Sequence, residues 1–195
     1  MQLIIKYSFL IVICCLINCK NSKRESDANK QLVKPMEKII PKYGKPYFDY
    51  DQIDYYHTDI GEDSAMDLFD NQDKSKKNKL KFEVIIGETP KSIKDSGFIK
   101  NLNGIGFKRF KIKSNNFKKI DSIFVEKSTN KGISSSCIAI YRDILIFRKQ
   151  KKIVGIAKIY FECDQNYIVG SSANTENFGQ NGDYIKLSQI LNQNK

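Results

Sequence analysis

The residues whose types best suit chemistry lie in one acidic stretch, residues 49–73. This stretch holds nine Asp and Glu side chains and no Lys or Arg, and it contains His57, the only histidine of the chain. Carboxylate oxygens bind hard cations such as Ca²⁺, and an imidazole beside carboxylates is a candidate metal ligand or general base. One hypothesis is therefore a metal-assisted hydrolase in which Asp54, His57 and Asp59 converge on a single site.

The same stretch also has a structural interpretation, which we prefer. Residues 70–74 lack the glycine and the terminal glutamate of an EF-hand loop. Because the whole chain carries a net charge of +11, an acidic surface can face the protein's own basic elements. We therefore predict no catalytic residue, no cofactor and no metal ion, with Asp54, His57 and Asp59 as the candidates for the alternative.

Two cysteines, Cys137 and Cys163, enclose two apolar runs that are rich in β-branched and aromatic residues. Such runs predict a β-hairpin. A turn centred on Gln150 places the cysteines opposite each other, as a disulfide requires, whereas a turn at Gln150 and Lys151 places them on opposite faces. The sequence leaves both registers open, and a β-bulge could reconcile them. It also leaves open a disulfide, two buried thiols or a redox pair that lacks the CxxC spacing.

Three charged residues interrupt the apolar runs of this hairpin: Arg142, Asp143 and Lys158. Arg142 and Asp143 fall on opposite faces of a strand, so each needs its own partner if it is buried. One register places Asp143 opposite Lys158, and the other places Arg142 there. At Arg142 and Asp143 we predict a structural ion pair, or a strand with a partly wet face, in preference to a functional pocket. Asp143 is the ion-pair partner that one register offers to Lys158.

Residues 1–19 have the pattern of a leader. An early Lys6 precedes an eleven-residue apolar run, which is too short to span a bilayer but is typical of a signal peptide. The run ends in the letters LINC, residues 16–19. This ending resembles the lipobox of bacterial lipoproteins, in which the cysteine becomes the lipidated first residue, although Asn18 stands where the usual motif has a small residue. The resemblance implies a membrane anchor at Cys19.

The leader and the composition together imply a cellular location. Cys14 and Cys15 are competing lipidation sites with poorer flanks, and the composition is similar to that of Bacteroidota lipoproteins. The residues after Cys19 lack the acidic cluster that resembles a surface-export signal. We therefore expect a lipid-anchored protein of the bacterial cell envelope, on the periplasmic side. The rest of the chain resembles no family with an assigned activity.

The basic charge does not by itself indicate nucleic-acid binding. The chain is rich in Ile, Lys and Asn and lacks Trp, a bias typical of AT-rich genomes, and no nucleic-acid-binding motif is present. We predict a membrane contact through Cys19, no nucleic acid, and a non-catalytic binding module for an envelope protein or another envelope component. An immunity or inhibitor-type lipoprotein is an alternative within this class, and the metal-assisted hydrolase is the alternative outside it.

The pattern of apolar residues predicts a signal peptide (1–19), a polar tether (20–46) and one α+β domain (47–195). We expect a mainly antiparallel sheet of five or six strands, with two or three helices packed on one face. The expected strands are 50–58, 80–88, 105–112, 138–147, 153–161 and 167–171, and the expected helices are 64–69, 89–102, 114–126 and one that starts at 183.

Overall fold

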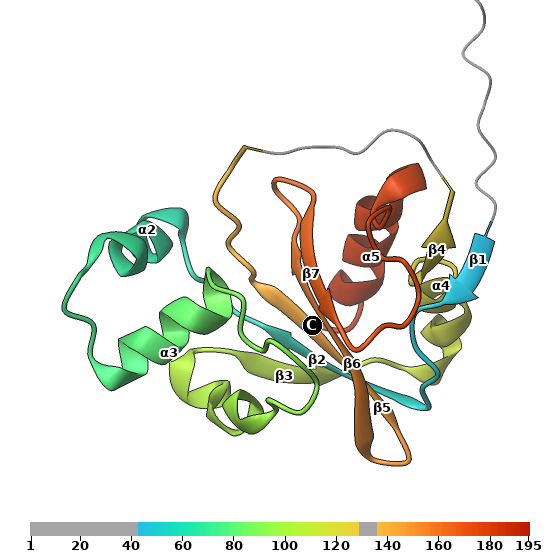
Figure 1. Cartoon of the computed structure of the whole chain (residues 1–195), viewed down its shortest axis with the longest axis horizontal. Helices are drawn as coiled ribbons and strands as arrows, with labels where there is room; N and C mark the ends of the chain where they lie inside the picture. Colours follow the sequence, from blue (N-terminus) through green and yellow to red (C-terminus); the bar gives the residue numbers. More distant parts are fainter. Residues whose placement is uncertain (1–42, 129–135) are drawn as a thin grey trace, which may run out of the picture. The chain divides into compact units, whose positions relative to one another are not determined.

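A computed structural model describes residues 43–128 and 136–195 (Figure 1). Its centre is a five-stranded antiparallel sheet in the order β3-β2-β5-β6-β7. A second, two-stranded sheet pairs β1 with β4. The predicted α+β class with a five-stranded antiparallel sheet is confirmed. The strands are β1 (Tyr43–Pro46), β2 (Gln52–His57), β3 (Lys108–Lys111), β4 (Val125–Lys127), β5 (Asp143–Lys149), β6 (Lys152–Tyr160) and β7 (Gln165–Val169).

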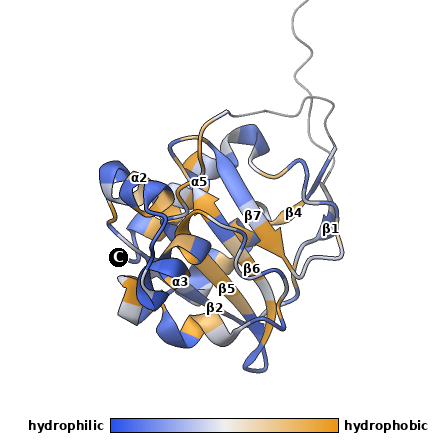
Figure 2. Cartoon of the chain, turned by 60° about the vertical axis from the view of Figure 1, so that its left-hand side comes forward, coloured by the Kyte–Doolittle hydropathy of each residue, from blue (hydrophilic) through white to orange (hydrophobic). Residues whose placement is uncertain are grey.

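Helices cover both faces of the sheet, whereas the sequence analysis placed them on one face. Ile144 and Ile146 of β5 pack with α2 and α3, while Leu145 and Phe147 pack with α4 and α5. A strand that is apolar on both faces has to be covered twice, which explains the difference. Figure 2 shows hydrophobic residues along β5 and β6, with hydrophilic residues on the outer turns of α2 and α3. The helices are α2 (Glu62–Asp70), α3 (Lys76–Ile85), α4 (Phe117–Asp121) and α5 (Asp183–Asn192), with 3-10 turns η1 (Gly97–Asn101), η2 (Asn103–Ile105), η3 (Ser114–Asn116) and η4 (Gln180–Gly182).

The hairpin of β5 and β6 has its turn at Gln150 and Lys151. Both residues have positive φ, 47° and 67°, as a two-residue turn between twisted strands requires. A bulge after Phe147 then shifts the register, so that Ile144 lies opposite Lys158. Neither register from the sequence analysis therefore holds along the whole hairpin, because a bulge adds one residue to β6.

Helix α3 replaces the strand predicted for residues 80–88. The side chain of Ser75 accepts a hydrogen bond from Asn78 N at 3.2 Å, which caps the helix inside a segment that the sequence analysis took for a loop. Leu80 and Val84 lie four residues apart, so they share a helix face as well as a strand face. A short apolar run fits both periods, and here the cap and the packing of Val84 against the sheet decide.

The helix predicted for residues 89–102 is absent, and only η1 forms within it. The carbonyl oxygen of Thr89 accepts a hydrogen bond from Lys158 Nζ at 3.1 Å, so it is committed outside any helix. Gly97 also stands in the middle of the predicted helix, where a glycine costs about 1 kcal/mol relative to alanine. Phe98 and Leu102 are nevertheless buried by the 3-10 turns.

The domain extends further toward the N-terminus than predicted. Residues Tyr43–Pro46 form β1, although they fall in the predicted tether, because they find a partner in β4. Strand β4 likewise occupies the end of the helix predicted for 114–126, which shortens to η3 and α4. The expected loop 128–136 lies almost wholly outside the described residues.

Cys137 and Cys163 form a disulfide, with their Cα atoms 6.7 Å apart. Cys137 precedes β5 and is not part of the hairpin ladder. The bond therefore does not depend on the strand register, which the sequence analysis had linked to it.

Candidate functional site

The structure separates the three residues of the hydrolase hypothesis. Asp54 lies on the face of β2 that packs toward α2 and α3, whereas His57 lies on the opposite face, because successive strand residues alternate. The carboxylate of Asp54 is 1% exposed and accepts hydrogen bonds from Arg109 at 2.8 Å and Arg148 at 2.7 Å. Burial raises the pKa of Asp54, but these bonds outweigh it and hold the pKa below its usual value. Asp54 is thus neutralised within the fold and does not join His57 and Asp59.

His57 lies between two carboxylates. Its Nδ1 is 2.8 Å from Asp143 Oδ1 and its Nε2 is 2.9 Å from Asp59 Oδ1. The hydroxyl of Tyr55 donates to the same Asp143 oxygen at 2.5 Å, and Lys195 Nζ lies 3.2 Å from Nε2. The hydrogen bond to Asp143 raises the pKa of His57, and burial opposes this. Both ring nitrogens of His57 lie within hydrogen-bond distance of a carboxylate, so neither is free to act as a general base.

Lys158 is the most deeply buried cation of the hairpin, with 0% of its surface exposed. Its Nζ donates to Gly87 O at 2.6 Å and Thr89 O at 3.1 Å. The rings of Tyr141 and Tyr167 lie 4.5 Å and 5.2 Å from the ammonium. The ion pair predicted for Lys158 is absent from the described residues. Carbonyl oxygens and aromatic faces replace it as partners.

The environment of Lys158 disfavours the charged form. Burial lowers the pKa of Lys158 to about 7, and the carboxylates of Glu88 and Glu83 oppose this shift. The side chain ties the segment after α3 to β6, because its two acceptors are backbone carbonyls of that segment. Lys158 is therefore a structural clamp between these two segments.

Arg142, the third of these charges, is also occupied. Its Nε donates to Ile60 O at 2.8 Å, it forms an ion pair with Glu162, and it lies over the ring of Tyr160 at 5.7 Å. These contacts explain how a charged residue fits beside an apolar strand.

One buried ion pair was not predicted. Lys127 at the end of β4 and Asp183 at the start of α5 lie 2.6 Å apart and are almost fully buried. Lys127 Nζ also donates to Ile123 O at 2.5 Å. Burial lowers the pKa of Lys127, and Asp183 opposes the shift. Asp183 was noted only as a helix start, and nothing in the sequence links residues 56 positions apart.

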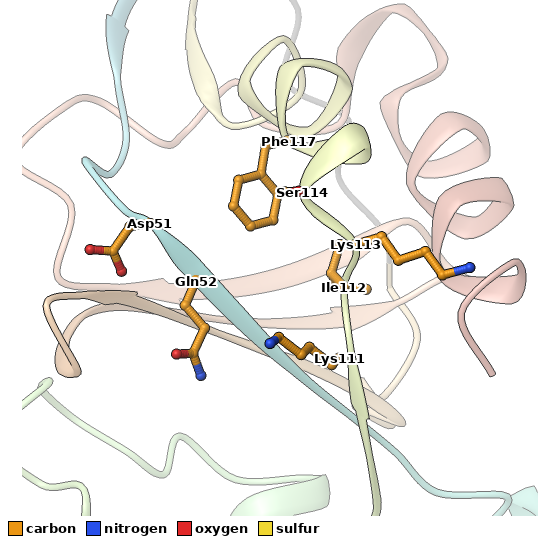
Figure 3. Close-up of a pocket in the computed structure, with 7 residues that line it drawn as sticks. All are labelled: Asp51, Gln52, Lys111, Ile112, Lys113, Ser114 and Phe117. Carbon is orange, nitrogen blue, oxygen red and sulfur yellow. The ribbon is translucent and has the colours of Figure 1, made fainter.

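Figure 3 shows a groove of about 590 Å³ between the start of β2, the end of β3 and the turn before α4. Asp51 accepts a hydrogen bond from Gln150 N at 2.8 Å, and the side chain of Lys113 points away from Asp51 (Figure 3). The charged residues of the lining are Asp51, which is already bonded to the turn between β5 and β6, and the lysines Lys111 and Lys113. The lining residues are Asp51, Gln52, Lys111, Ile112, Lys113, Ser114 and Phe117.

A second groove, of about 630 Å³, lies between α3 and η2. Leu80 and Ile105 form its apolar part, and Lys76 and Lys77 stand at its side. Both lysines are exposed, and in the described part of the chain neither forms an ion pair. An apolar surface beside free ammonium groups suits an anionic partner that also has an apolar side chain.

Within residues 43–128 and 136–195, no cluster of three or more His, Cys, Asp or Glu side chains could hold a metal ion, and no helix is long and apolar enough to cross a bilayer. Cys19 and the leader lie outside these residues. No protein-family model, curated protein or solved structure matches the chain.

The clamp formed by Lys158 predicts a stability that depends on pH. Between about pH 7 and pH 10 the unfolded chain keeps the proton that the folded Lys158 has released, so this residue's contribution to stability rises with pH. We expect the difference in unfolding free energy between the wild type and Lys158→Met to change in favour of the wild type by about 1 kcal/mol per pH unit between about pH 7 and about pH 9. Denaturant unfolding at each pH measures the difference. Lys118→Met, at an exposed position of α4, is the control. A flat difference for Lys158→Met would contradict the lowered pKa.

His57 predicts the opposite trend. Its pKa is raised in the folded state, so its contribution to stability is fully present below about pH 6.5 and is lost as the pH rises through the folded pKa. We expect the difference in unfolding free energy between the wild type and His57→Gln to favour the wild type more at about pH 6 than at about pH 9. No other histidine titrates in this range, and a direct NMR titration of the imidazole checks the assignment. An imidazole pKa at or below the ordinary value would refute this interpretation.

Proposed function

We propose that the chain is a lipid-anchored protein of the bacterial cell envelope whose domain is a non-catalytic binding module for another protein. The observation that carries the binding proposal is the pair of helices α2 and α3, which present opposite charges side by side. The anchor rests on the leader sequence and its resemblance to a lipobox at Cys19. Both parts are tested separately below.

The charges of α2 and α3 are available to a partner. Helix α2 exposes Glu62, Asp63, Asp67 and Asp70, and helix α3 begins with a run of lysines. The two helices pack together, and the ring centroids of Phe69 and Phe82 lie 6.3 Å apart. None of the acidic side chains of α2 or the lysines of α3 forms an ion pair with another described residue. The opposite charges of α2 and α3 are therefore not paired with each other by direct contacts.

The placement of the lysines is unfavourable for the helix itself. Lys76, Lys77 and Lys79 lie in the first turns of α3, where the helix dipole is positive and each cation typically costs about 0.3–1 kcal/mol. The first turn contains no acidic residue. Folding stability alone does not favour such a sequence, whereas a binding role for the lysines accounts for it.

The combined surface fits a protein better than a membrane or a nucleic acid. A polyanionic surface that meets the lysines of α3 would also meet the carboxylates of α2 and be repelled by them. A protein surface with both signs of charge is complementary to both helices. Its acidic residues would lie beside Lys76 and Lys77, with an apolar side chain against Leu80 and Ile105.

The anchor predicts a specific mass for the protein purified from its own membranes without reductant. We expect the mass of the chain from Cys19 onward plus acyl groups, reduced by two hydrogens for the disulfide. Cys19→Ser should abolish both the cleavage and the acylation. An unprocessed mass would refute the anchor and leave the binding proposal standing.

If α3 is the binding surface, cross-linking of the chain to its partner in intact envelopes should depend on the charges of α3. We expect Lys76→Glu combined with Lys77→Glu to remove the main cross-linked protein that the wild type captures, because the reversed charges repel its acidic side chains. Lys118→Glu combined with Lys119→Glu, on exposed positions of α4, is the matched control. Equal capture by the wild type and both variants would show that α3 is not the binding surface.

A further inference from the structure

The two edges of the five-stranded sheet differ in charge. Strand β3 reads KRFK, and its charged side chains protect it from pairing with another strand. Strand β7 reads QNYIV and contains neither a charge nor a proline. All five of its residues are partly exposed. An uncharged edge strand is open to pairing with a further strand.

The hydrogen bonds of the central strands show which backbone groups face which neighbour. Thr58 N donates to Arg142 O at 3.0 Å, and Ile112 N donates to Ile53 O at 3.4 Å. In an antiparallel sheet these directions alternate along each strand. The even-numbered residues of β2 therefore bond to β5, and its odd-numbered residues bond to β3.

The same alternation carries across to the free edge. Up to the bulge, odd-numbered residues of β5 lie opposite odd-numbered residues of β6. Odd-numbered residues of β7 lie opposite even-numbered residues of β6. The even-numbered residues of β5 face β2, so its odd-numbered residues face β6. It follows that β7 bonds to β6 through residues 165, 167 and 169, and that the N–H and C=O groups of Asn166 and Ile168 point away from the sheet.

These outward groups have no partner in the part of the chain that the structure describes. No backbone hydrogen bond to Asn166 or Ile168 exists there outside the β6–β7 ladder. The side chain of Asn166 donates to Tyr184 Oη at 2.9 Å, on the face covered by α5, and so leaves the edge open. Exposed N–H and C=O groups in a row form a template for another strand.

We propose that two copies of this chain associate through their β7 strands, antiparallel and about a two-fold axis at Tyr167. Asn166 of each copy lies opposite Ile168 of the other, and each of these pairs exchanges two hydrogen bonds. Tyr167 lies opposite the same residue of the second copy in a position without hydrogen bonds, where cross-strand aromatic pairs are favourable. The two sheets then form one continuous sheet.

The charges at the two ends of β7 favour this antiparallel arrangement. Asp164 precedes the strand and is exposed. Gly170 follows it, and Ile93 packs so closely there that a Cβ at this glycine would lie 2.5 Å from Ile93 Cγ2. The exposed Lys91 and Lys94 flank Ile93. An antiparallel pair brings the acidic start of each strand to the basic end of the other.

A second copy is a better occupant than a strand of arbitrary sequence, because the edge is self-complementary. The contact is also small, since five residues bury less than the roughly 1,600 Å² of a standard interface. We therefore expect a weak dimer, which a concentration series reveals. This surface is separate from α2 and α3, so the outcome is independent of the proposed binding function.

Residue-resolved amide hydrogen exchange tests the pairing on the full-length wild-type chain in detergent, from about 10 µM to about 1 mM protein. We expect protection of the Asn166 and Ile168 amides to rise with protein concentration, in step with dimer formation seen by sedimentation. The alternation places the amides of Arg109 and Lys111 outward on β3, and these should stay unprotected. A monomer at all concentrations, or protection that does not change with concentration, overturns the proposal.

A variant confirms the surface. Ile168→Pro removes an outward N–H and no bond to β6, so we expect a monomer that still unfolds cooperatively. Lys111→Pro makes the same change on the opposite edge and should dimerise like the wild type. If the Asn166 amide gains protection with concentration as strongly in Ile168→Pro as in the wild type, pairing through β7 is contradicted.

Discussion

Strands β5 and β6 are apolar on both faces, and the rest of the fold follows from the need to cover them twice. Ile144 and Ile146 require α2 and α3 on one side, while Leu145 and Phe147 require α4 and α5 on the other. Two edges remain, and one of them, β7, has no charged residue to protect it.

Double coverage also determines how the charged residues of the sheet are accommodated. A charge on a covered face cannot reach bulk water, so each finds its partner from another element. Asp54 takes two arginines from β3 and β5, and His57 takes the carboxylate of Asp143 from β5. Lys158 takes backbone carbonyls from the segment after α3. These charged groups form hydrogen bonds and ion pairs that hold the layers together, and they lie apart from one another in the sheet.

The two proposed binding surfaces lie outside the core. Helices α2 and α3 carry charged side chains that form no ion pair with the described residues. The outer edge of β7 carries backbone groups that form no hydrogen bond with them. One would contact a different protein through complementary charge, and the other a second copy through main-chain hydrogen bonds. The two proposals rely on different physical interactions, so salt should weaken the first more than the second.

The fold class, the central hairpin with its two-sided apolar strands and the helix that starts at residue 183 could be predicted from the sequence. Each of these features follows from the local periodicity of apolar residues or from a short turn signal. The sequence did not determine α3, because the run 80–88 fits a helix and a strand equally well and only the capping Ser75 and the packing of Val84 against the sheet decide. It also could not supply the partners of Lys158, Asp54 or Lys127, or the pairing of β1 with β4. Those contacts join residues far apart in the chain, and they exist only once the sheet is formed and covered, since burial is what forces each charge to find a partner.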